Sequence, residues 1–342
     1  MKARLVLERK NFRRYLVIKL GLIFFLFSSI AYGKMYAPRA VYGEDNRQDI
    51  YEVRNPLYLE LARSTAGLVD NYLLKKNKNA LTYSIDTEQL YNLEKGIKLC
   101  SSEKFSQQYM LTSCSGFLIA EDKMVTAGHC YDSFEEEEAC NSASWVFDLN
   151  MDGPEYINLE EIPADNVYHC KKVIKLATDG ALDFAIIELD RKVMGRTPLK
   201  FRTEGKISDD AELVTIGHPS MLPTKVTAGG MILENQDSFE FIANLDTFQG
   251  NSGSAVFDAQ TGQLEGILTS GKTDYVMSSE NGQSCQVVNR CDENGLNCTG
   301  KDHGSLFITG ESVLRISALT KFLYNHLDGL TDGSLTFINP LC

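Results

Sequence analysis

The sequence predicts an all-β protein that ends in a helix. Short runs rich in β-branched and aromatic residues recur in two groups and are separated by turn residues. The first group comprises the runs 114–120, 123–127, 144–149, 168–176 and 184–189. The second comprises the runs 212–217, 224–227, 231–235, 239–243, 254–257 and 263–269. Strands at such spacing indicate a sandwich or a barrel, and the second group has enough strands for a second barrel.

Apolar residues near the end of the sequence recur at helical spacing and predict the closing helix. They are Val313, Leu314, Ile316, Leu319, Phe322, Leu323 and Leu327. Between the two groups of strands, the charged and glycine-containing stretch 196–208 interrupts the apolar pattern and is the predicted linker. We therefore expect a first barrel over residues 105–200 and a second barrel with its helix over residues 201–342.

The start of the chain has the pattern of an export signal. Seven Lys/Arg residues precede the apolar run 20–30, and Ala31-Tyr32-Gly33 places small residues where a signal peptidase cuts. A membrane anchor is the alternative, but the apolar run is shorter than the roughly 20 residues that a spanning helix needs. We therefore predict a signal peptide over residues 1–33, a secreted protein (extracellular or periplasmic), and no membrane contact after the signal is removed.

Residues 34–104 precede the predicted barrels. The stretch 34–56 carries turn formers and charges, and 57–68 has apolar positions compatible with a short helix. We expect this part to be an N-terminal extension or a propeptide.

The charge balance restricts the partners. The 342 residues carry a formal net charge of -12, with 34 Lys/Arg against 46 Asp/Glu. Removal of residues 1–33 takes away seven basic residues and one acid, which leaves 27 minus 45, or -18. Such a surface repels nucleic acid, so we expect no nucleic-acid partner.

Nine cysteines in an exported chain indicate disulfides, with one sulfur left over. Cys140 and Cys170 are expected to join within the first barrel. Cys285, Cys291 and Cys298 crowd a loop rich in Gly and Asn. A zinc site is the alternative there, but the spacing lacks a second ligand pair, and disulfides fit better. Cys100 and Cys342 are left without a predicted partner.

Three motifs carry chemistry in the order His, Asp, Ser. They are Thr126-Ala127-Gly128-His129-Cys130, an aspartate before the apolar run 184–187, and the loop 246–254, which contains Gly250-Asn251-Ser252-Gly253-Ser254. A serine hydroxyl attacks a carbonyl only when a histidine base and an orienting carboxylate assist it. Asp179 and Asp190 are alternatives for the acid, but we favour Asp183 because its apolar neighbours hold it at the mouth of a buried strand.

Over roughly residues 105 to 325 these motifs resemble the trypsin-like (chymotrypsin-fold) serine peptidases, bacterial branch near the V8/glutamyl endopeptidases. The resemblance implies two six-stranded antiparallel Greek-key barrels with a C-terminal helix and a polypeptide substrate, and we expect a monomer that requires no cofactor. It implies the catalytic residues His129, Asp183 and Ser252, with the amides of Gly250 and Ser252 as the oxyanion hole. It also implies a disulfide between Cys114 and Cys130, beneath the histidine.

Activation should differ from that of trypsin. Trypsin-type zymogens pair a new N-terminal amine with an aspartate just before the nucleophile, and this chain has the neutral Asn251 there. The stretch 39–47 resembles the mature start of V8-type enzymes, so we expect cleavage near Arg39.

Substrate choice rests on residues around the serine and the last strand. The histidine that binds an acidic side chain in glutamyl endopeptidases is replaced by Leu268, whereas the hydroxyl of Thr247 is kept. Asp246 matches the aspartate that selects Arg or Lys in trypsin, and the alternative is an aspartate that turns outward or caps a turn. Thr269, Ser270 and Gly271 are expected to bind the substrate backbone as an added strand.

Three alternatives stay open at the level of the sequence. Residues 148–153 open like a calcium loop, but the closing glutamate is missing, so we prefer a turn and no metal. The predicted activity is that of a secreted serine endopeptidase, possible specificities being after Arg/Lys, after Glu or after apolar residues. A non-catalytic secreted binding module and an esterase that uses the same triad are the rival functions.

Overall fold

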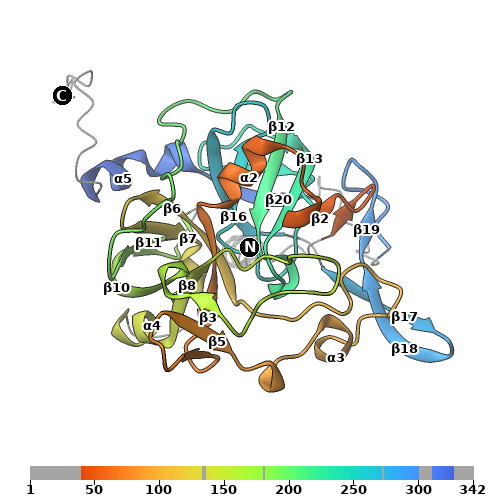
Figure 1. Cartoon of the computed structure of the whole chain (residues 1–342). Helices are drawn as coiled ribbons and strands as arrows, with labels where there is room; N and C mark the ends of the chain where they lie inside the picture. The colour runs from red at the N-terminus through yellow and green to blue at the C-terminus, as the bar shows by residue number, and fades with distance from the viewer. Residues whose placement is uncertain (1–39, 133–135, 180–181, 272, 300–309, 327–342) are drawn as a thin grey trace, which may run out of the picture. The chain divides into compact units, whose positions relative to one another are not determined.

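The computed structural model of the chain describes residues 40–132, 136–179, 182–271, 273–299 and 310–326 (Figure 1). The predicted signal peptide, Leu327 and Cys342 lie outside these residues. Among the described residues, no helix is both long and apolar enough to cross a membrane.

The first barrel is closed and has six antiparallel strands in the order β10-β11-β7-β6-β3-β8 (Figure 1). Five of the six were predicted. The strands are β3 (Thr65–Asp70), β6 (Cys114–Ala120), β7 (Lys123–Thr126), β8 (Ala143–Phe147), β10 (Val167–Ala177) and β11 (Phe184–Leu189).

Strand β3 was not predicted, and it extends the first barrel upstream of the expected boundary at residue 105. It pairs with β6 on one side and with β8 on the other. The helix expected over 57–68 is shorter: α2 covers Pro56–Ala62, and β3 follows almost at once. The apolar residues of α2 run directly into those of β3. Only the pairing of β3 with β6 and β8 therefore shows where the helix ends and the strand begins. Part of the expected extension is therefore a structural part of the barrel.

The second barrel also has six strands, in the order β12-β15-β16-β20-β14-β13, and pairing of β12 with β13 closes it. β2 adds to the outer side of β13. The elements are β2 (Arg47–Asp49), β12 (Glu212–Gly217), β13 (Lys225–Glu234), β14 (Glu240–Ala243), β15 (Ala255–Asp258), β16 (Leu264–Ser270) and β20 (Glu311–Arg315). The chain thus forms the two antiparallel barrels that the sequence predicted.

The closing helix starts later than its apolar pattern suggested. Val313 and Leu314 lie in β20, which pairs with β14 and β16, and α5 covers Thr320–His326 after the 3-10 turn η6 (Ile316–Leu319). Successive residues of a strand face opposite sides, so Val313 packs into the second barrel and Leu314 into the core shared with the first. Because β20 is buried on both faces, Val313 and Leu314 are both apolar, and in the sequence they joined the helical spacing of the residues that follow.

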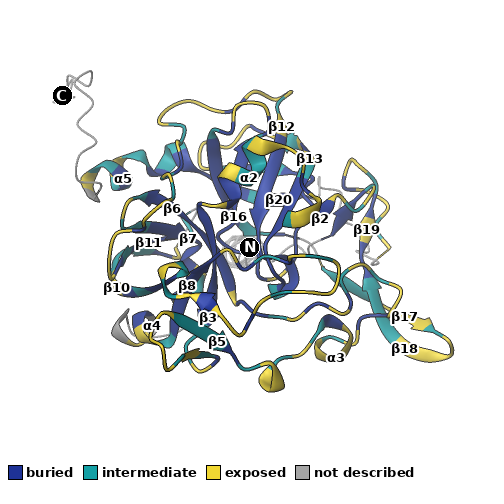
Figure 2. Ribbon diagram, in the orientation of Figure 1, coloured by how far each residue is buried: buried dark blue, intermediate teal, exposed yellow. Residues whose placement is uncertain are grey.

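The shared core explains why several strands have no polar alternation. In β11, Phe184 and Ile186 face the core between the barrels, whereas Ala185 and Ile187 fill the interior of the first barrel. The same division applies to β6 and β12. Figure 2 shows these strands buried along their length. A strand buried on both faces reads as a continuous apolar run.

Smaller elements surround the barrels. β1 (Val41–Tyr42) pairs in parallel with β19 (Arg290–Cys291), and β17 (Tyr275–Glu280) forms a hairpin with β18 (Gln283–Val288). The remaining strands are β4 (Leu74–Lys76), β5 (Thr82–Ile85) and β9 (Ile162–Pro163). The remaining helices and 3-10 turns are η1 (Ile50–Glu52), η2 (Thr87–Gln89), α3 (Leu93–Gly96), η3 (Gly128–Cys130), α4 (Glu136–Ser142), η4 (Ala164–Asn166) and η5 (Pro219–Met221).

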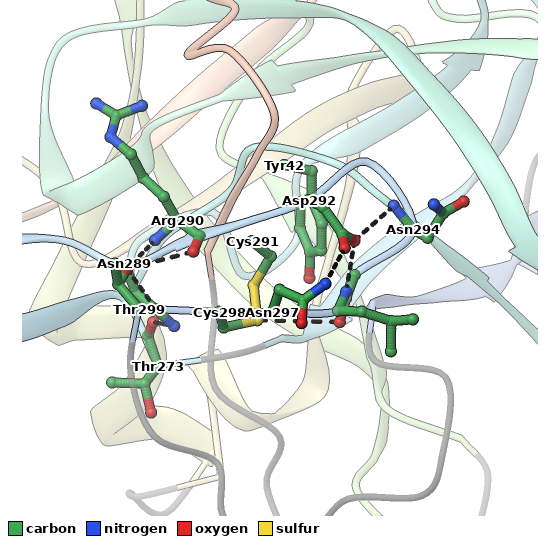
Figure 3. Close-up of a disulfide and its surroundings, with 12 residues drawn as sticks. Tyr42, Thr273, Asn289, Arg290, Cys291, Asp292, Asn294, Asn297, Cys298 and Thr299 are labelled. Atoms are coloured by element: carbon green, nitrogen blue, oxygen red, sulfur yellow. Dashed lines mark hydrogen bonds between the residues drawn. A yellow bond between two sulfur atoms is a disulfide. The ribbon is translucent and has the colours of Figure 1, made fainter.

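Four disulfides hold the described part of the chain. Cys114–Cys130 and Cys140–Cys170 form as predicted. Cys100 pairs with Cys285, which ties the segment before the first barrel to the β17–β18 hairpin. Cys291 pairs with Cys298 (Figure 3). The late cysteines are thus bonded to sulfur, in line with the disulfide interpretation and not with the zinc alternative.

Candidate active site

His129 and Asp183 meet because their strands are neighbours. β7 pairs with β11, with Thr126 opposite Ala185, so the residues just after β7 lie beside those just before β11. Gly128 is required at this point, because a Cβ there would lie 2.2 Å from the Ala177 carbonyl oxygen. Fold and local sequence together place the histidine against the predicted acid.

Two hydrogen bonds join this pair. The Nδ1 atom of His129 lies 2.7 Å from Oδ2 of Asp183, and the backbone N–H of His129 donates to Oδ1 at 2.9 Å. Both carboxylate oxygens are therefore used to orient one residue. Because Nδ1 faces the carboxylate, Nε2 is the ring nitrogen left for proton exchange. The alternative acid Asp190 instead accepts from the backbone of His169 and pairs with Arg191.

The Ser252 loop rests against the strands that carry His129. The backbone N–H of Ser115, in β6, donates to the Ser252 carbonyl at 2.8 Å. Sγ of Cys130, the residue after His129, lies 3.9 Å from the same oxygen. Gly253 packs so tightly here that a Cβ would lie 2.1 Å from the Ser115 carbonyl oxygen. The loop thus places its backbone next to the histidine motif.

Gly250 occupies a position that only glycine fits. Its φ of 95° lies in the left-handed region, and a Cβ there would be 2.5 Å from the His218 carbonyl oxygen. The N–H of Asn251 donates to the Phe248 carbonyl at 2.9 Å and closes the turn. The Asn251 side chain accepts from Ser254 Oγ at 3.0 Å and is buried. Asn251 is therefore engaged inside its own loop.

Asp246 is not placed as the sequence suggested. Its Oδ1 accepts the backbone N–H of Tyr42 at 2.7 Å, and its Oδ2 accepts that of Asn46 at 2.8 Å. The carboxyl group is 2 % exposed, and burial raises its pKa to about 7. With both oxygens bonded to main chain, Asp246 fits the alternative interpretation, an aspartate that caps a turn, and not a residue that receives a substrate cation.

Thr247 is linked to the N-terminal residues through Glu311 of β20. Its hydroxyl donates to Oε2 of Glu311, and the Tyr42 hydroxyl donates to Oε1 of Glu311 at 3.0 Å. All three residues are buried. Tyr42 and Glu311 were missed at the level of the sequence, because neither lies in a recognisable motif and they are 269 residues apart.

We name residues 40–49 the N-terminal segment. Its strand β2 adds to β13 of the second barrel, its strand β1 pairs with β19 outside the barrel, and the buried Asp49 pairs with Nζ of Lys225 at 2.6 Å. Arg47 lies over the ring of Phe248 at 4.1 Å, so the segment reaches the turn before Ser252. Figure 3 shows Tyr42 beside the Cys291–Cys298 disulfide. The segment thus contacts the nucleophile loop at the residues that precede Ser252.

The residues predicted to bind the substrate backbone lie at the end of β16. The N–H of Gly253 donates to the Leu268 carbonyl at 2.8 Å, which fixes this strand end beside the nucleophile loop. Ser270 pairs with Ser312 of the neighbouring strand β20, and the Thr269 hydroxyl donates to the Ser312 carbonyl at 3.3 Å. Gly271 follows directly. Their role in binding stays a prediction.

Two groups of potential metal ligands have other partners. Cys114, His129 and Cys130 lie close together, but the two sulfurs form a disulfide and no thiolate is available. Asp148, at the start of the calcium-like loop, pairs with Nη2 of Arg196 at 2.7 Å. The Arg196 guanidinium therefore provides the positive charge beside the Asp148 carboxylate.

Residues 114–267 match the family model of the trypsin-like peptidase domain. The chain contains a trypsin-like peptidase domain. The matched residues include His129, Asp183 and Ser252, which confirms the resemblance that the motifs indicated. No curated protein sequence matches the chain.

Solved structures with a similar fold are peptidases. A Glu endopeptidase in complex with MPD is 17% identical, with 83% of this chain and 97% of that chain covered and a TM-score of 0.42. The active form of the Rv3671c protease from M. tuberculosis is 14% identical, with 86% and 93% covered and a TM-score of 0.44. The Vibrio cholerae VesB protease is 14% identical, with 82% and 67% covered and a TM-score of 0.46.

Proposed function

We propose that this trypsin-like peptidase domain is catalytically competent and hydrolyses peptide bonds as a secreted serine endopeptidase. The observation that carries the proposal is the 2.7 Å contact between His129 Nδ1 and Asp183 Oδ2, at the edge of the barrel on which the Ser252 loop rests. The sequence motifs supply all three residues, and the contacts that support them join His129 to Asp183 and bring the Ser252 carbonyl beside Cys130.

The proposed reaction has two halves. Ser252 Oγ attacks the scissile carbonyl while His129 takes its proton, and the resulting imidazolium protonates the leaving amine. Water then attacks the acyl-enzyme with the same histidine as base, and Ser252 is released. Asp183 holds the ring and stabilises its charged form. The amides of Gly250 and Ser252 bind the oxyanion in both halves.

Secretion is supported by the disulfides and by the predicted signal peptide. Four disulfides indicate folding in an oxidising compartment. We propose that any processing cut lies near Arg39 and leaves the mature chain with its N-terminal segment, because β2 extends the sheet of the second barrel and Tyr42 and Asn46 donate to Asp246. N-terminal sequencing of the secreted protein tests this: a mature start downstream of Asp49 would contradict it.

We infer that specificity for Arg or Lys does not depend on Asp246, because both of its oxygens accept backbone N–H groups of the N-terminal segment. Cleavage-site profiling on a proteome digest separates the three specificities that the sequence left open. We expect the residue preference before the cut to be the same for wild type and for Asp246→Ser. A preference for Arg/Lys that is lost in Asp246→Ser would show that Asp246 binds the basic side chain of the substrate.

Peptide hydrolysis by matched variants tests the activity. We expect Ser252→Ala to lose about 10⁴-fold or more in kcat. Ser64→Ala is the control: this serine is also buried, and its hydroxyl donates to the Thr197 carbonyl at 2.6 Å, away from the site. It should stay close to wild type. Peptide turnover by Ser252→Ala at the wild-type rate, or turnover by wild type of esters but not of peptides, would contradict the proposal.

A non-catalytic binding module is the other function that this fold supports. The bonded His129–Asp183 pair disfavours it, because a module without chemistry has no need to orient the imidazole. Wild-type protein that is folded but turns over neither peptides nor esters would favour this function.

A further inference from the structure

Ser115 lies where the two barrels meet beneath the nucleophile loop. It follows Cys114 in β6 of the first barrel and is 1% exposed. Its hydroxyl donates to the Gly250 carbonyl at 2.8 Å and accepts the backbone N–H of His218 at 2.9 Å. Its own N–H donates to the Ser252 carbonyl at 2.8 Å. One residue of the first barrel therefore binds three backbone groups of the second.

The direction of the hydroxyl hydrogen is fixed by this arrangement. The His218 N–H can only donate, so it must point at a lone pair of Ser115 Oγ. The Gly250 carbonyl can only accept, so it must receive the hydroxyl hydrogen. The carbonyl of Ser115 in turn accepts from Thr126 Oγ1 at 2.7 Å, which holds the backbone of β6 against β7. Ser115 is thus rigidly placed and fully bonded.

The two carbonyls that Ser115 holds belong to the two residues whose amides are the predicted oxyanion donors. Gly250 lacks a side chain and has a φ of 95°, so its backbone rotates more freely than that of other residues. The Gly250 carbonyl shares a planar peptide unit with the Asn251 N–H, which donates to the Phe248 carbonyl, so the Ser115 hydroxyl and Phe248 hold the two sides of the same peptide plane. Within the described residues, the Ser115 hydroxyl is the side chain that binds the Gly250 carbonyl.

We propose that Ser115 is a positioning residue for the oxyanion hole. This inference rests on the proposed function. The Ser115 hydroxyl holds the peptide plane that follows Gly250, which limits rotation about this glycine and so helps the Gly250 N–H in the preceding peptide plane to keep the direction needed for the transition-state oxyanion. Through His218 the same hydroxyl links this direction to the docking of the barrels. The ring of His218 is bonded to the Leu222 carbonyl at 2.9 Å, so the N–H that anchors Ser115 is itself fixed.

Replacement of the hydroxyl tests the proposal. In Ser115→Ala the hole should be present but less well ordered, so kcat on a peptide substrate should fall about tenfold to hundredfold with KM within threefold of wild type. Affinity for a peptidyl boronic acid, whose adduct with Ser252 places an oxygen in the hole, should fall by the same factor. Affinity for the cleaved product peptide should not change.

Ser64→Ala is the matched control, since the residue type, the burial and the loss of a hydroxyl–carbonyl bond are the same. Ser115→Gly is the second variant, because it also lacks the hydroxyl and keeps the N–H that binds Ser252. Both Ser115 variants should show the same loss after correction for folded protein, and Ser64→Ala should show none. If either folded Ser115 variant keeps kcat within threefold of Ser64→Ala, or loses kcat without losing boronate affinity, the positioning role is wrong. Failure of wild type to turn over any peptide would instead count against the proposed function.

Discussion

Asp183 and Asp246 were both expected to serve the active site, yet their surroundings differ completely. Asp183 is partly exposed and gives both oxygens to His129, one to its ring and one to its backbone. Asp246 is buried and gives both oxygens to backbone N–H groups of the N-terminal segment. The first carboxylate orients a reactive side chain, whereas the second anchors a segment 200 residues away.

The difference between the two aspartates shows when a sequence motif predicts the hydrogen-bond partner of a side chain. His129 and Asp183 are 54 residues apart, just after β7 and just before β11, two neighbouring strands that were both predicted, so the motifs and the fold agree. The partners of Asp246 lie in a segment expected to be an extension or a propeptide. Asp246 was predicted to be a specificity residue only from its distance in sequence to Ser252. That distance does not determine which groups the carboxylate binds.

The largest effect should come from Asp183→Asn. An amide at this position no longer fixes the tautomer of His129 or stabilises the imidazolium, so kcat should fall about 10⁴-fold while the fold is kept. Asp190→Asn is the control, because Asp190 contacts His169 and Arg191 and not His129. Steady-state kinetics on a peptide substrate measures both variants. A loss in kcat below tenfold for Asp183→Asn would mean that Asp183 does not orient His129 for catalysis, so that it differs from Asp246 less than its contacts indicate.

Asp246→Ser should affect stability more than chemistry. Serine is too short to replace both oxygens, so the N–H groups of Tyr42 and Asn46 lose their acceptor, at a cost of about 1–3 kcal/mol. Denaturant unfolding should show this loss, and limited proteolysis should cut the N-terminal segment sooner than in wild type. Unchanged stability together with a changed cleavage preference would contradict the anchoring role.

The pH dependence of stability should change in the same variant. Burial raises the pKa of Asp246 to about 7, against the influence of Arg47 and together with that of Asp45. The native state therefore holds the proton more tightly, and the Asp246 contribution to stability falls as pH rises from about 4 to about 7. Burial lowers the pKa of His218 to about 4, with Lys225 nearby. Its contribution falls in the opposite direction, as pH drops from about 6.5 to about 4.

These two contributions oppose each other in wild type. Asp246→Ser removes one of them, so its unfolding free energy should rise with pH between about 4.5 and 6.5 more steeply than that of wild type, by up to about 1 kcal/mol per pH unit. Urea titrations at several pH values measure the slope. Equal slopes for the two proteins would show that Asp246 does not titrate in this range.

The strands that alternate with clear turn residues were predictable, and β6, β11 and β12 were predicted to the residue. β3 and β20 were not, because their apolar residues continue into neighbouring helical elements and only long-range pairing defines them. The Cys100–Cys285 bond was likewise beyond prediction, since its cysteines are 185 residues apart. Ser115 carried no signal of its own, because its role depends on backbone groups brought to it by the second barrel.

The central claim is that Ser252 is a nucleophile activated by His129 and oriented through Asp183. Labelling with a fluorophosphonate, followed by peptide mass spectrometry, tests it directly because the reagent reacts with activated serines. The account predicts one label on wild type, located on Ser252, and none on Ser252→Ala or His129→Ala. A label on another serine, a label that survives Ser252→Ala, or no label on the folded wild-type protein would contradict it.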